Sequence, residues 1–260
     1  SLMLTPVKGP LTPPLSLYIH IPWCVRKCPY CDFNSHATEG GQTIPEANYI
    51  KALLADLRVE LAAVNGRTLH SIFIGGGTPS LMSAAGIGEI LRFVNSNITC
   101  EKNMEVTLEA NPGTFEQKKF SDYRAKGVNR LSIGVQSFDD TQLISLGRVH
   151  SSKEALDAVK NAKLAGFDNI NIDLMHGLPN QSIDEAINDL MCAIKLEPNH
   201  ISWYQLTIEP NTIFFNKPPK LPTEILVEVI QEKGAEILLD AGYKQYEVSA
   251  YCKKNKRSAH

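Results

Sequence analysis

Residues 17–31 decide the fold, and they read LYIHIPWCVRKCPYC. The first of them, Leu17–Ile21, form a short apolar run that predicts a buried strand. Directly after that strand come Cys24, Cys28 and Cys31, in the spacing C-x3-C-x2-C. Three thiols on one tight loop at the end of a strand predict a metal site at the start of an α/β chain.

Three thiolates on one loop suit three corners of an iron–sulfur cube, because thiolates are the usual ligands of such clusters. Since no fourth cysteine lies nearby, one iron would stay open to an outside ligand. Two alternatives stay open. One is a structural zinc site, for which His20 or His36 would supply the fourth ligand. The other is three ordinary buried cysteines, but the spacing favours the cluster.

Outward from this loop, apolar runs alternate with amphipathic stretches. Further strands are predicted over 71–74, 105–108, 131–135, 170–174 and 201–206. Helices are predicted over 47–64, the late 80s to mid 90s, 115–126, 151–166 and 182 to about 198, the last two opening with capping boxes. Six such units predict an α/β fold with a parallel sheet and helices outside it. The pattern alone leaves a doubly wound sheet, an open barrel and a closed barrel possible.

The pattern changes after residue 207, where prolines mark a linker. A helix over 223–240 and a short strand over 246–248 follow. The chain then stops without a further helix that would cover this strand. We therefore predict three parts: an irregular leader over 1–16, an α/β core over 17–207, and a linker with the truncated start of a smaller C-terminal domain over 208–260.

Composition excludes some classes of protein. Lys and Arg total 26 against 28 Asp and Glu, a net charge of −2, which argues against binding nucleic acid through phosphate neutralisation. No apolar run approaches about 18 residues, and the first residues lack a basic start before an apolar core. We therefore expect a cytoplasmic protein whose six cysteines are reduced or bind metal.

Glycines and polar residues lie at the carboxyl ends of the predicted strands. Gly75–Gly77 would let backbone N–H groups approach a ligand, or would form a plain tight turn. Barrel enzymes place ligand contacts at strand ends, as Glu109, Gln136 and Asp173 are placed, although loop solvation or helix capping also explains such residues. Arg148 suits a carboxylate through paired N–H bonds, or a surface ion pair.

The cysteine spacing, with an aromatic residue before the last cysteine, resembles the signature of the radical S-adenosylmethionine (radical SAM) superfamily. The resemblance implies that Cys24, Cys28 and Cys31 hold a [4Fe-4S] cluster, whose open iron binds the amino and carboxylate groups of S-adenosylmethionine. In that family, one electron from the cluster cleaves the sulfonium to methionine and a 5′-deoxyadenosyl radical. The implied fold is a partial (β/α)6 TIM-like barrel of the radical SAM type, here over 17–207.

Six motifs in order narrow the resemblance to oxygen-independent coproporphyrinogen III oxidases and their relatives, the heme chaperones of the HemW type. They lie at 18–24, 75–80, 109–113, 130–138, 146–150 and 173–179. The resemblance implies that the following residues line the S-adenosylmethionine site: Tyr18, Gly76, Gly77, Thr78, Glu109, Gln136, Arg148 and Asp173. The glycine loop would receive the methionyl amino group. Tyr30 would stack on adenine, cover the cluster, or both.

Two departures from the oxidases favour the heme chaperone branch. The oxidases have another cysteine two residues past the cluster, where this chain has Phe33, and a longer N-terminal extension. We therefore expect a protein that binds heme and passes it to an acceptor protein. The alternatives are the oxidase itself, which converts coproporphyrinogen III to protoporphyrinogen IX by oxidative decarboxylation, and a non-enzymatic zinc or redox module.

The expected ligands and partners are the cluster, S-adenosylmethionine, heme or porphyrin, a heme-acceptor protein and an unidentified electron donor. No nucleic acid is expected, whereas a homodimer and a weak association with a membrane surface are compatible with the resemblance. His150 and His176 are candidates for contacts with heme, although ordinary polar loop residues are the simpler interpretation. No catalytic residue is predicted, and the resemblance leaves open whether the chain catalyses a reaction.

Overall fold

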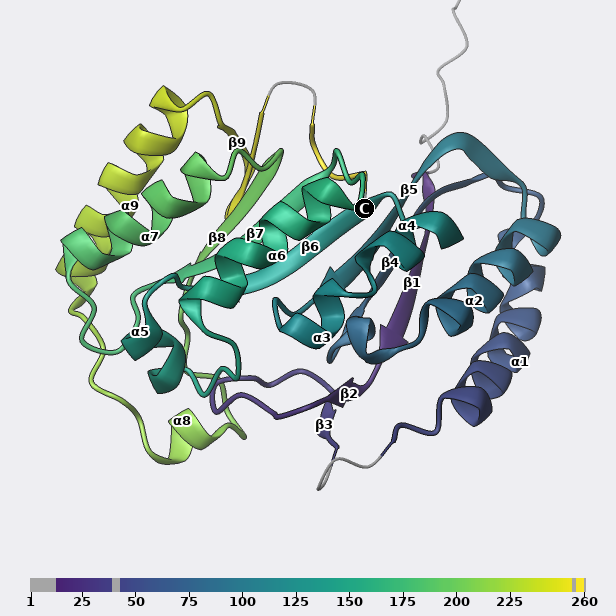
Figure 1. Cartoon of the computed structure of the whole chain (residues 1–260), viewed down its shortest axis with the longest axis horizontal. Helices are drawn as coiled ribbons and strands as arrows, with labels where there is room; N and C mark the ends of the chain where they lie inside the picture. Colours follow the sequence, from purple (N-terminus) through teal and green to yellow (C-terminus); the bar gives the residue numbers. More distant parts are fainter. Residues whose placement is uncertain (1–12, 39–42, 254–255, 260) are drawn as a thin grey trace, which may run out of the picture.

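Six parallel strands lie in chain order in one sheet, and they correspond to the six apolar runs of the sequence (Figure 1). The structure is a computed structural model that describes residues 13–38, 43–253 and 256–259. The parallel strands are β1 (Leu15–Ile21), β4 (Leu69–Gly76), β5 (Cys100–Ala110), β6 (Arg130–Gln136), β7 (Ile170–His176) and β8 (His200–Gln205). The sheet continues through β10 (Ala250–Cys252) to β9 (Lys244–Glu247), both antiparallel to their neighbours.

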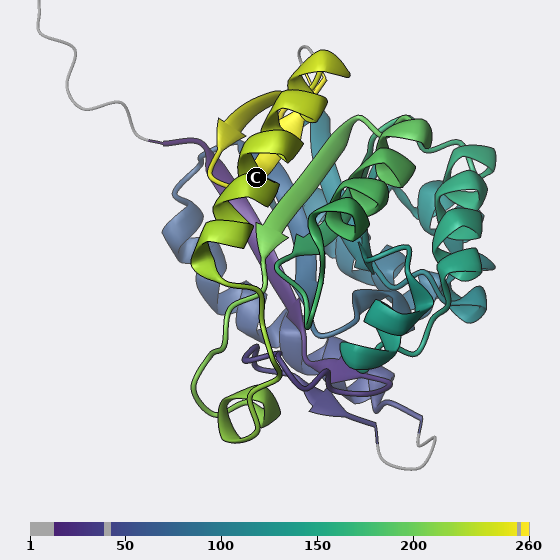
Figure 2. The same cartoon turned by 90° about the vertical axis from the view of Figure 1, so that its left-hand side faces the viewer.

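Helices follow the strands, and the longer ones cover one face of the sheet, whereas the short α8 (Ile213–Asn216) lies beyond the carboxyl ends of the strands, against the cysteine loop (Figures 1 and 2). They are α1 (Glu46–Val64), a 3₁₀ turn (Pro79–Leu81), α2 (Ala84–Asn97), α3 (Thr114–Gln117), α4 (Phe120–Lys126), α5 (Asp140–Ser145), α6 (Ser152–Leu164), α7 (Ile183–Lys195), α8 (Ile213–Asn216) and α9 (Glu224–Asp240). The predicted capping boxes are confirmed at the starts of α6 and α7, where Ser151 and Ser182 accept from the backbone three residues on. The prediction of a partial (β/α)6 barrel is also confirmed, and β1 and β9 are the edges of the open sheet in the described chain.

Alternating residues of the strands divide between the core and the inside of the barrel. In β6, Ile133 and Val135 join the main hydrophobic core under the helices. Their neighbours Ser132, Gly134 and Gln136 line a cavity on the other face. Because a strand turns successive side chains to opposite faces, one run of sequence builds both the apolar core and a polar interior.

The structure differs from the sequence predictions mainly at the ends of elements. The predicted strand over 105–108 is the much longer β5, and β1 begins at Leu15, inside the predicted leader, of which residues 1–12 lie outside the described residues. The predicted helix over 115–126 is two helices, α3 and α4. They separate near Lys119, whose ammonium donates to the carbonyl oxygens of Leu81 and Met82 at 3.3 and 3.1 Å.

The sheet does not end at residue 207, where the sequence analysis divides the chain. Strand β10, which was not predicted, pairs with β8, and α9 packs beside α7. Near the end of the chain, the Ser258 hydroxyl and the Ala259 N–H both donate to Glu105 of β5, each at 2.9 Å. None of the helices in the described ranges is long and apolar enough to cross a membrane.

Candidate functional site

A cavity of about 550 Å³ opens at the carboxyl ends of the parallel strands. It brings together residues that the sequence places more than a hundred positions apart. Eleven of the twelve predicted site residues line it: Cys24, Cys28, Tyr30, Cys31, Gly76, Gly77, Thr78, Glu109, Gln136, Arg148 and Asp173. This is the edge of the sheet at which α/β barrels bind their ligands.

The twelfth predicted residue, Tyr18, does not line the cavity. Its side chain is 50% exposed, and its ring stacks near Phe73 with 6.3 Å between the ring centroids. Its hydroxyl donates to Nδ1 of His20 at 3.0 Å, because Nε2 of His20 faces the carbonyl oxygen of Asn34 at 2.8 Å and must itself be the donor. Tyr18 therefore lies on the inner surface of β1, beside the cavity.

The cysteine loop is held in place from both sides. On one side Cys24 lies in β2 (Trp23–Cys24), a two-residue strand that pairs with β3 (His36–Ala37). The Thr78 N–H donates to the carbonyl oxygen of Trp23 at 2.7 Å, which joins the loop to the end of β4. On the other side the Phe214 N–H of α8 donates to the carbonyl oxygen of Pro29 at 2.9 Å. Backbone hydrogen bonds thus fix the loop to the sheet on one side and to α8 on the other.

The structure uses the N–H groups of the glycine loop, Gly75–Gly77, differently from what the sequence suggests. The N–H groups of Gly76 and Gly77 are not free for a ligand, because they donate to Glu109 at 3.1 Å and to the carbonyl oxygen of Ile21 at 2.7 Å. Glycine is needed here for close packing: a Cβ on Gly77 would lie 2.6 Å from the carbonyl oxygen of Trp23, and Gly76 has a φ of +118°. What such a loop offers a ligand is carbonyl oxygens, which suit an ammonium group.

The three thiols line one cavity, as the ligands of an iron–sulfur cube would. Across the described parts of the chain, no three His, Cys, Asp or Glu side chains surround a point that one metal ion could occupy. A tetrahedral zinc site needs four such ligands around one point. Ligands of a cube bind different irons, so three thiols spread around one cavity fit that group.

Arg148 is the buried cation of the cavity, which Arg26 also lines, and the N–H groups of Arg148 are largely engaged by the protein. Its Nη2 donates to Oδ1 of Asn111 at 2.7 Å and to the carbonyl oxygen of Gly134 at 2.9 Å. Its Nη1 lies 3.5 Å from Sγ of Cys28. The predicted pairing of two parallel N–H bonds with one carboxylate is therefore wrong for this conformation, because both hydrogens of Nη2 are already used.

Two carboxyl groups lie in the inner wall of the cavity. Burial raises the pKa of Glu109 to about 8, and the neighbouring Asp173 adds to this shift. Burial also raises the pKa of Asp173, whose carboxylate accepts from Asn171 at 2.7 Å and from Ser132 at 3.1 Å. A ligand with a positive charge or several donors would compensate both groups.

Gln136 ends β6 in an unusual backbone conformation, with a φ of +69°. Its side chain is fixed by a residue that the sequence analysis missed. The hydroxyl of Tyr204 donates to Oε1 of Gln136 at 2.6 Å, and both residues line the cavity. Left-handed backbone in a residue other than glycine is often kept at functional sites. The only sequence signal for Tyr204 was its place near the end of the sixth strand.

The two candidate histidines lie outside this cavity. Nε2 of His150 donates to the carbonyl oxygen of Val135 at 3.0 Å, and burial lowers the pKa of His150 to about 4. The ring of His176 packs against Trp203 with 4.4 Å between the ring centroids, and burial lowers its pKa to about 4 as well. Both imidazoles are therefore neutral near pH 7.

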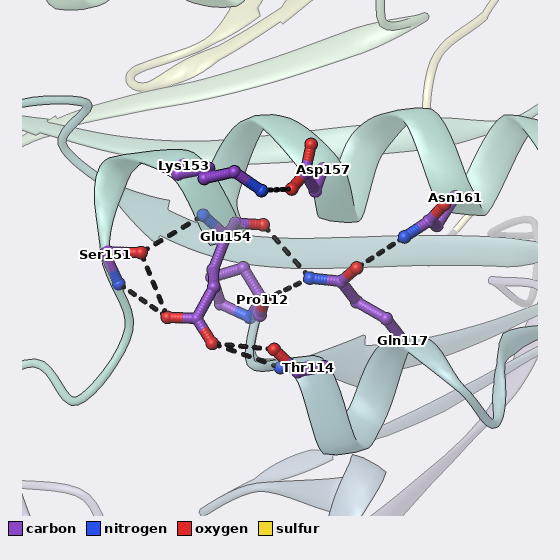
Figure 3. A network of polar contacts seen from close by, with 8 residues as sticks. All are labelled: Pro112, Thr114, Gln117, Ser151, Lys153, Glu154, Asp157 and Asn161. Carbon is purple, nitrogen blue, oxygen red and sulfur yellow. Dashed lines mark hydrogen bonds and ion pairs between the residues drawn. The ribbon is translucent and has the colours of Figure 1, made fainter.

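A polar network behind the cavity joins the loop after β5 to the loop before α6 (Figure 3). The carboxylate of Glu154 accepts from the Ser151 N–H at 2.9 Å and from the Thr114 hydroxyl at 2.9 Å. The amide of Gln117 donates to the carbonyl oxygens of Pro112 and Glu154 at 2.7 and 3.1 Å. The network fixes the spacing of two loops that carry cavity residues, Asn111 on one and Arg148 on the other.

The fold and the site together have clear relatives. The sequence matches the radical SAM superfamily over residues 18–191. It is 55% identical over 255 residues to the heme chaperone HemW of Haemophilus influenzae, covering 96% of this chain and 66% of that protein. It is 53% identical over 248 residues to the heme chaperone HemW of Escherichia coli, covering 95% of this chain and 65% of that protein.

Among solved structures, coproporphyrinogen III oxidase (HemN) from Escherichia coli, described as a radical SAM enzyme, superimposes with a TM-score of 0.84. It is 27% identical, and the match covers 93% of this chain and 56% of that one. The chain thus spans just under two thirds of its heme chaperone relatives and about half of that enzyme. The chain belongs to the radical SAM superfamily, which implies a [4Fe-4S] cluster and S-adenosylmethionine as its cofactors.

Proposed function

We propose that this chain is the cofactor-binding part of a heme chaperone, which binds heme and passes it to an acceptor protein. Support comes from its membership of the superfamily and from the identity of more than half of its residues with two heme chaperones. The proposed ligands of the cluster are Cys24, Cys28 and Cys31. The proposed contacts of S-adenosylmethionine are Tyr30, Gly76, Gly77, Thr78, Glu109, Gln136, Arg148 and Asp173.

Each group of residues has a distinct task in this proposal. Arg148 lies beside Cys28, with its Nη1 3.5 Å from Sγ, so it places a positive charge next to a proposed ligand of the cluster. Glu109 and Asp173 supply carboxylates for the amino and hydroxyl donors of the nucleotide. When bound, the cluster and the nucleotide supply one-electron chemistry, which an unidentified donor would feed.

Phe33 is the observation that carries the choice between chaperone and oxidase. The side chain is 62% exposed and lies at the cavity, in the position where the oxidases have a further cysteine. A benzyl group has no proton to give and no sulfur to bind metal. It does offer a flat apolar face, which a porphyrin ring would cover.

The test is an anaerobic reconstitution of the cluster in the wild type and in Cys28→Ser. With a chemical reductant, S-adenosylmethionine and coproporphyrinogen III present, we expect no protoporphyrinogen IX from either protein. Conversion by the wild type alone would overturn the proposal in favour of the oxidase. Heme titrated into the wild type should give a saturable change in absorbance.

Two substitutions then test the role of Phe33 in binding heme. Phe33→Ala should weaken heme binding about 10-fold, because it removes the apolar face of a residue worth roughly 1.5 kcal/mol or more when covered. Phe33→Tyr keeps that face and should bind like the wild type. Equal affinity in all three proteins would place the heme elsewhere.

The oxidase is the second candidate function. Its support is the superposition on coproporphyrinogen III oxidase over nearly the whole chain. The shared fold is compatible with either role, so the assay for protoporphyrinogen IX described above decides between them. Stoichiometric zinc without iron in protein purified anaerobically would instead favour a zinc module.

A further inference from the structure

Asn111 follows β5 and lies between two cavity residues that come from different parts of the chain. Its Nδ2 donates to Oγ1 of Thr78 at 3.1 Å, and its Oδ1 accepts from Nη2 of Arg148 at 2.7 Å. We propose that Asn111 is a positioning residue, which sets the Thr78 hydroxyl and the Arg148 guanidinium as two donors to one carboxylate of the ligand. The inference rests on the proposed function, in which that ligand is S-adenosylmethionine.

The chemistry of the three side chains fixes the direction of each hydrogen bond. Arginine carries only donors, so the oxygen of the Asn111 amide must face Arg148 and its nitrogen must face Thr78. The Thr78 hydroxyl therefore accepts from Asn111 and keeps its own hydrogen. The structure gives that hydrogen no acceptor among the described side chains and backbone, and Thr78 lines the cavity. The hydrogen is thus available to a ligand.

The hydrogen count of Arg148 leaves room for a second donor. Both hydrogens of Nη2 are used by Asn111 and by the Gly134 carbonyl oxygen, and the Nε hydrogen is buried without a partner in the described chain. One hydrogen of Nη1 points to Cys28, which leaves one for a ligand. One oxygen of the carboxylate would bind the open iron in this superfamily, yet the two oxygens keep lone pairs beyond those that the iron and one Arg148 hydrogen use, and the Thr78 hydroxyl can donate to one of them.

The size of the Asn111 amide matches this task. An amide and a carboxylate are planar groups of the same shape, with two polar atoms on one carbon. The amide joins Thr78 to Nη2 of Arg148 from the protein side, which keeps the Thr78 hydroxyl and the remaining hydrogen of Nη1 side by side for a carboxylate in the cavity. Glu154 joins Thr114 to Ser151, three residues after Asn111 and Arg148 respectively, and this network supports the spacing of the two loops (Figure 3).

The test compares two nucleotides on the reconstituted protein: S-adenosylmethionine, and its decarboxylated form, which keeps the sulfonium and the amino group. Asn111→Asp turns the amide into a carboxylate that occupies both donors and repels a second negative charge. We expect it to weaken binding of S-adenosylmethionine about 10- to 100-fold, and of the decarboxylated form less than about 3-fold. Equal losses for both nucleotides, with four irons per chain retained, would overturn the inference.

Substitutions at Thr78 keep the test decisive if Asn111→Asp folds poorly. Thr78→Val should weaken S-adenosylmethionine binding about 10-fold and should not affect the decarboxylated form, whereas Thr78→Ser should restore binding to within about 3-fold. An unchanged affinity in Thr78→Val would overturn the inference. If the reconstituted wild type binds neither nucleotide, it is the proposed function that fails.

Discussion

Replacing Glu109 by glutamine should make the protein without its cofactors more stable in neutral and alkaline solution. Burial holds the pKa of this carboxyl at about 8 in the folded chain, against 4.5 ordinarily. Between these values the unfolded chain has lost the proton and the folded chain has kept it. The free energy of unfolding therefore falls as the pH rises from about 4.5 to 8, and it levels off above. Glutamine cannot ionise, so Glu109→Gln removes this loss.

The size of the stabilisation by Glu109→Gln follows from the pKa shift of Glu109. The difference in pKa corresponds to roughly 5 kcal/mol at about 1.4 kcal/mol per unit. Since Glu109 opens onto a cavity that water enters, we expect about 2–3 kcal/mol of this to be measurable. The oxygen of the new amide can still accept from the Gly76 N–H, so the variant keeps that hydrogen bond.

Urea unfolding of metal-free protein at pH 5, 6, 7, 8 and 9 measures the effect. The free energy of unfolding of Glu109→Gln minus that of the wild type should grow with pH and reach a plateau above about pH 8. Glu60→Gln, at an exposed position on α1, is the control and should follow the wild type at every pH. If the free energies of unfolding of Glu109→Gln and the wild type differ by the same amount at every pH, Glu109 is not buried in its protonated form.

Three further predictions concern packing and hydrogen bonds around the cavity. Gly77→Ala should lower the iron content after reconstitution to less than half, because a Cβ there lies 3.1 Å from Sγ of Cys24; full iron loading would contradict this. Tyr204→Phe should weaken S-adenosylmethionine binding about 5- to 10-fold in calorimetry by freeing Gln136, and an unchanged affinity would show that Gln136 needs no support. Glu154→Gln should lower the free energy of unfolding at pH 7 by no more than about 1 kcal/mol in urea unfolding, because hydrogen bonds hold the pKa of this largely solvated carboxyl below its ordinary value; the loss should shrink as the pH falls below about 4.5, and a loss that does not depend on pH would contradict this.

The sequence predicts the six parallel strands well, because each is an apolar run that can be recognised without knowing which strands it pairs with. It predicts strand ends poorly, as β5 shows: Cys100–Met104 is half exposed and carries charged residues, so its pairing depends on neighbouring strands. The short elements α5, α8 and β10 escape prediction for a related reason. They are fixed by tertiary contacts, such as the hydrogen bond from Phe214 to Pro29, rather than by their own pattern.

The site shows the same division. Strand-end residues such as Glu109 and Asp173 are predictable, since parallel strands bring their carboxyl ends to one edge. The hydrogen-bond partners of the site residues cannot be predicted from the sequence. No sequence pattern says that the N–H of Gly77 is used by Ile21, that Tyr204 orients Gln136, or that Tyr18 lies beside the cavity rather than in its lining.

The cysteine loop has a consequence for how the protein matures. All three thiols come from eight neighbouring residues, 24–31, and they leave the ribosome before most of the sheet has been synthesised. A short stretch of nascent chain therefore already carries every proposed ligand of the cluster. The proposed nucleotide contacts, apart from Tyr30, come from segments between β4 and β7, so only the folded sheet brings them together. On this proposal, the ligands of the metal are complete early in synthesis, and those of the nucleotide only after the sheet has formed.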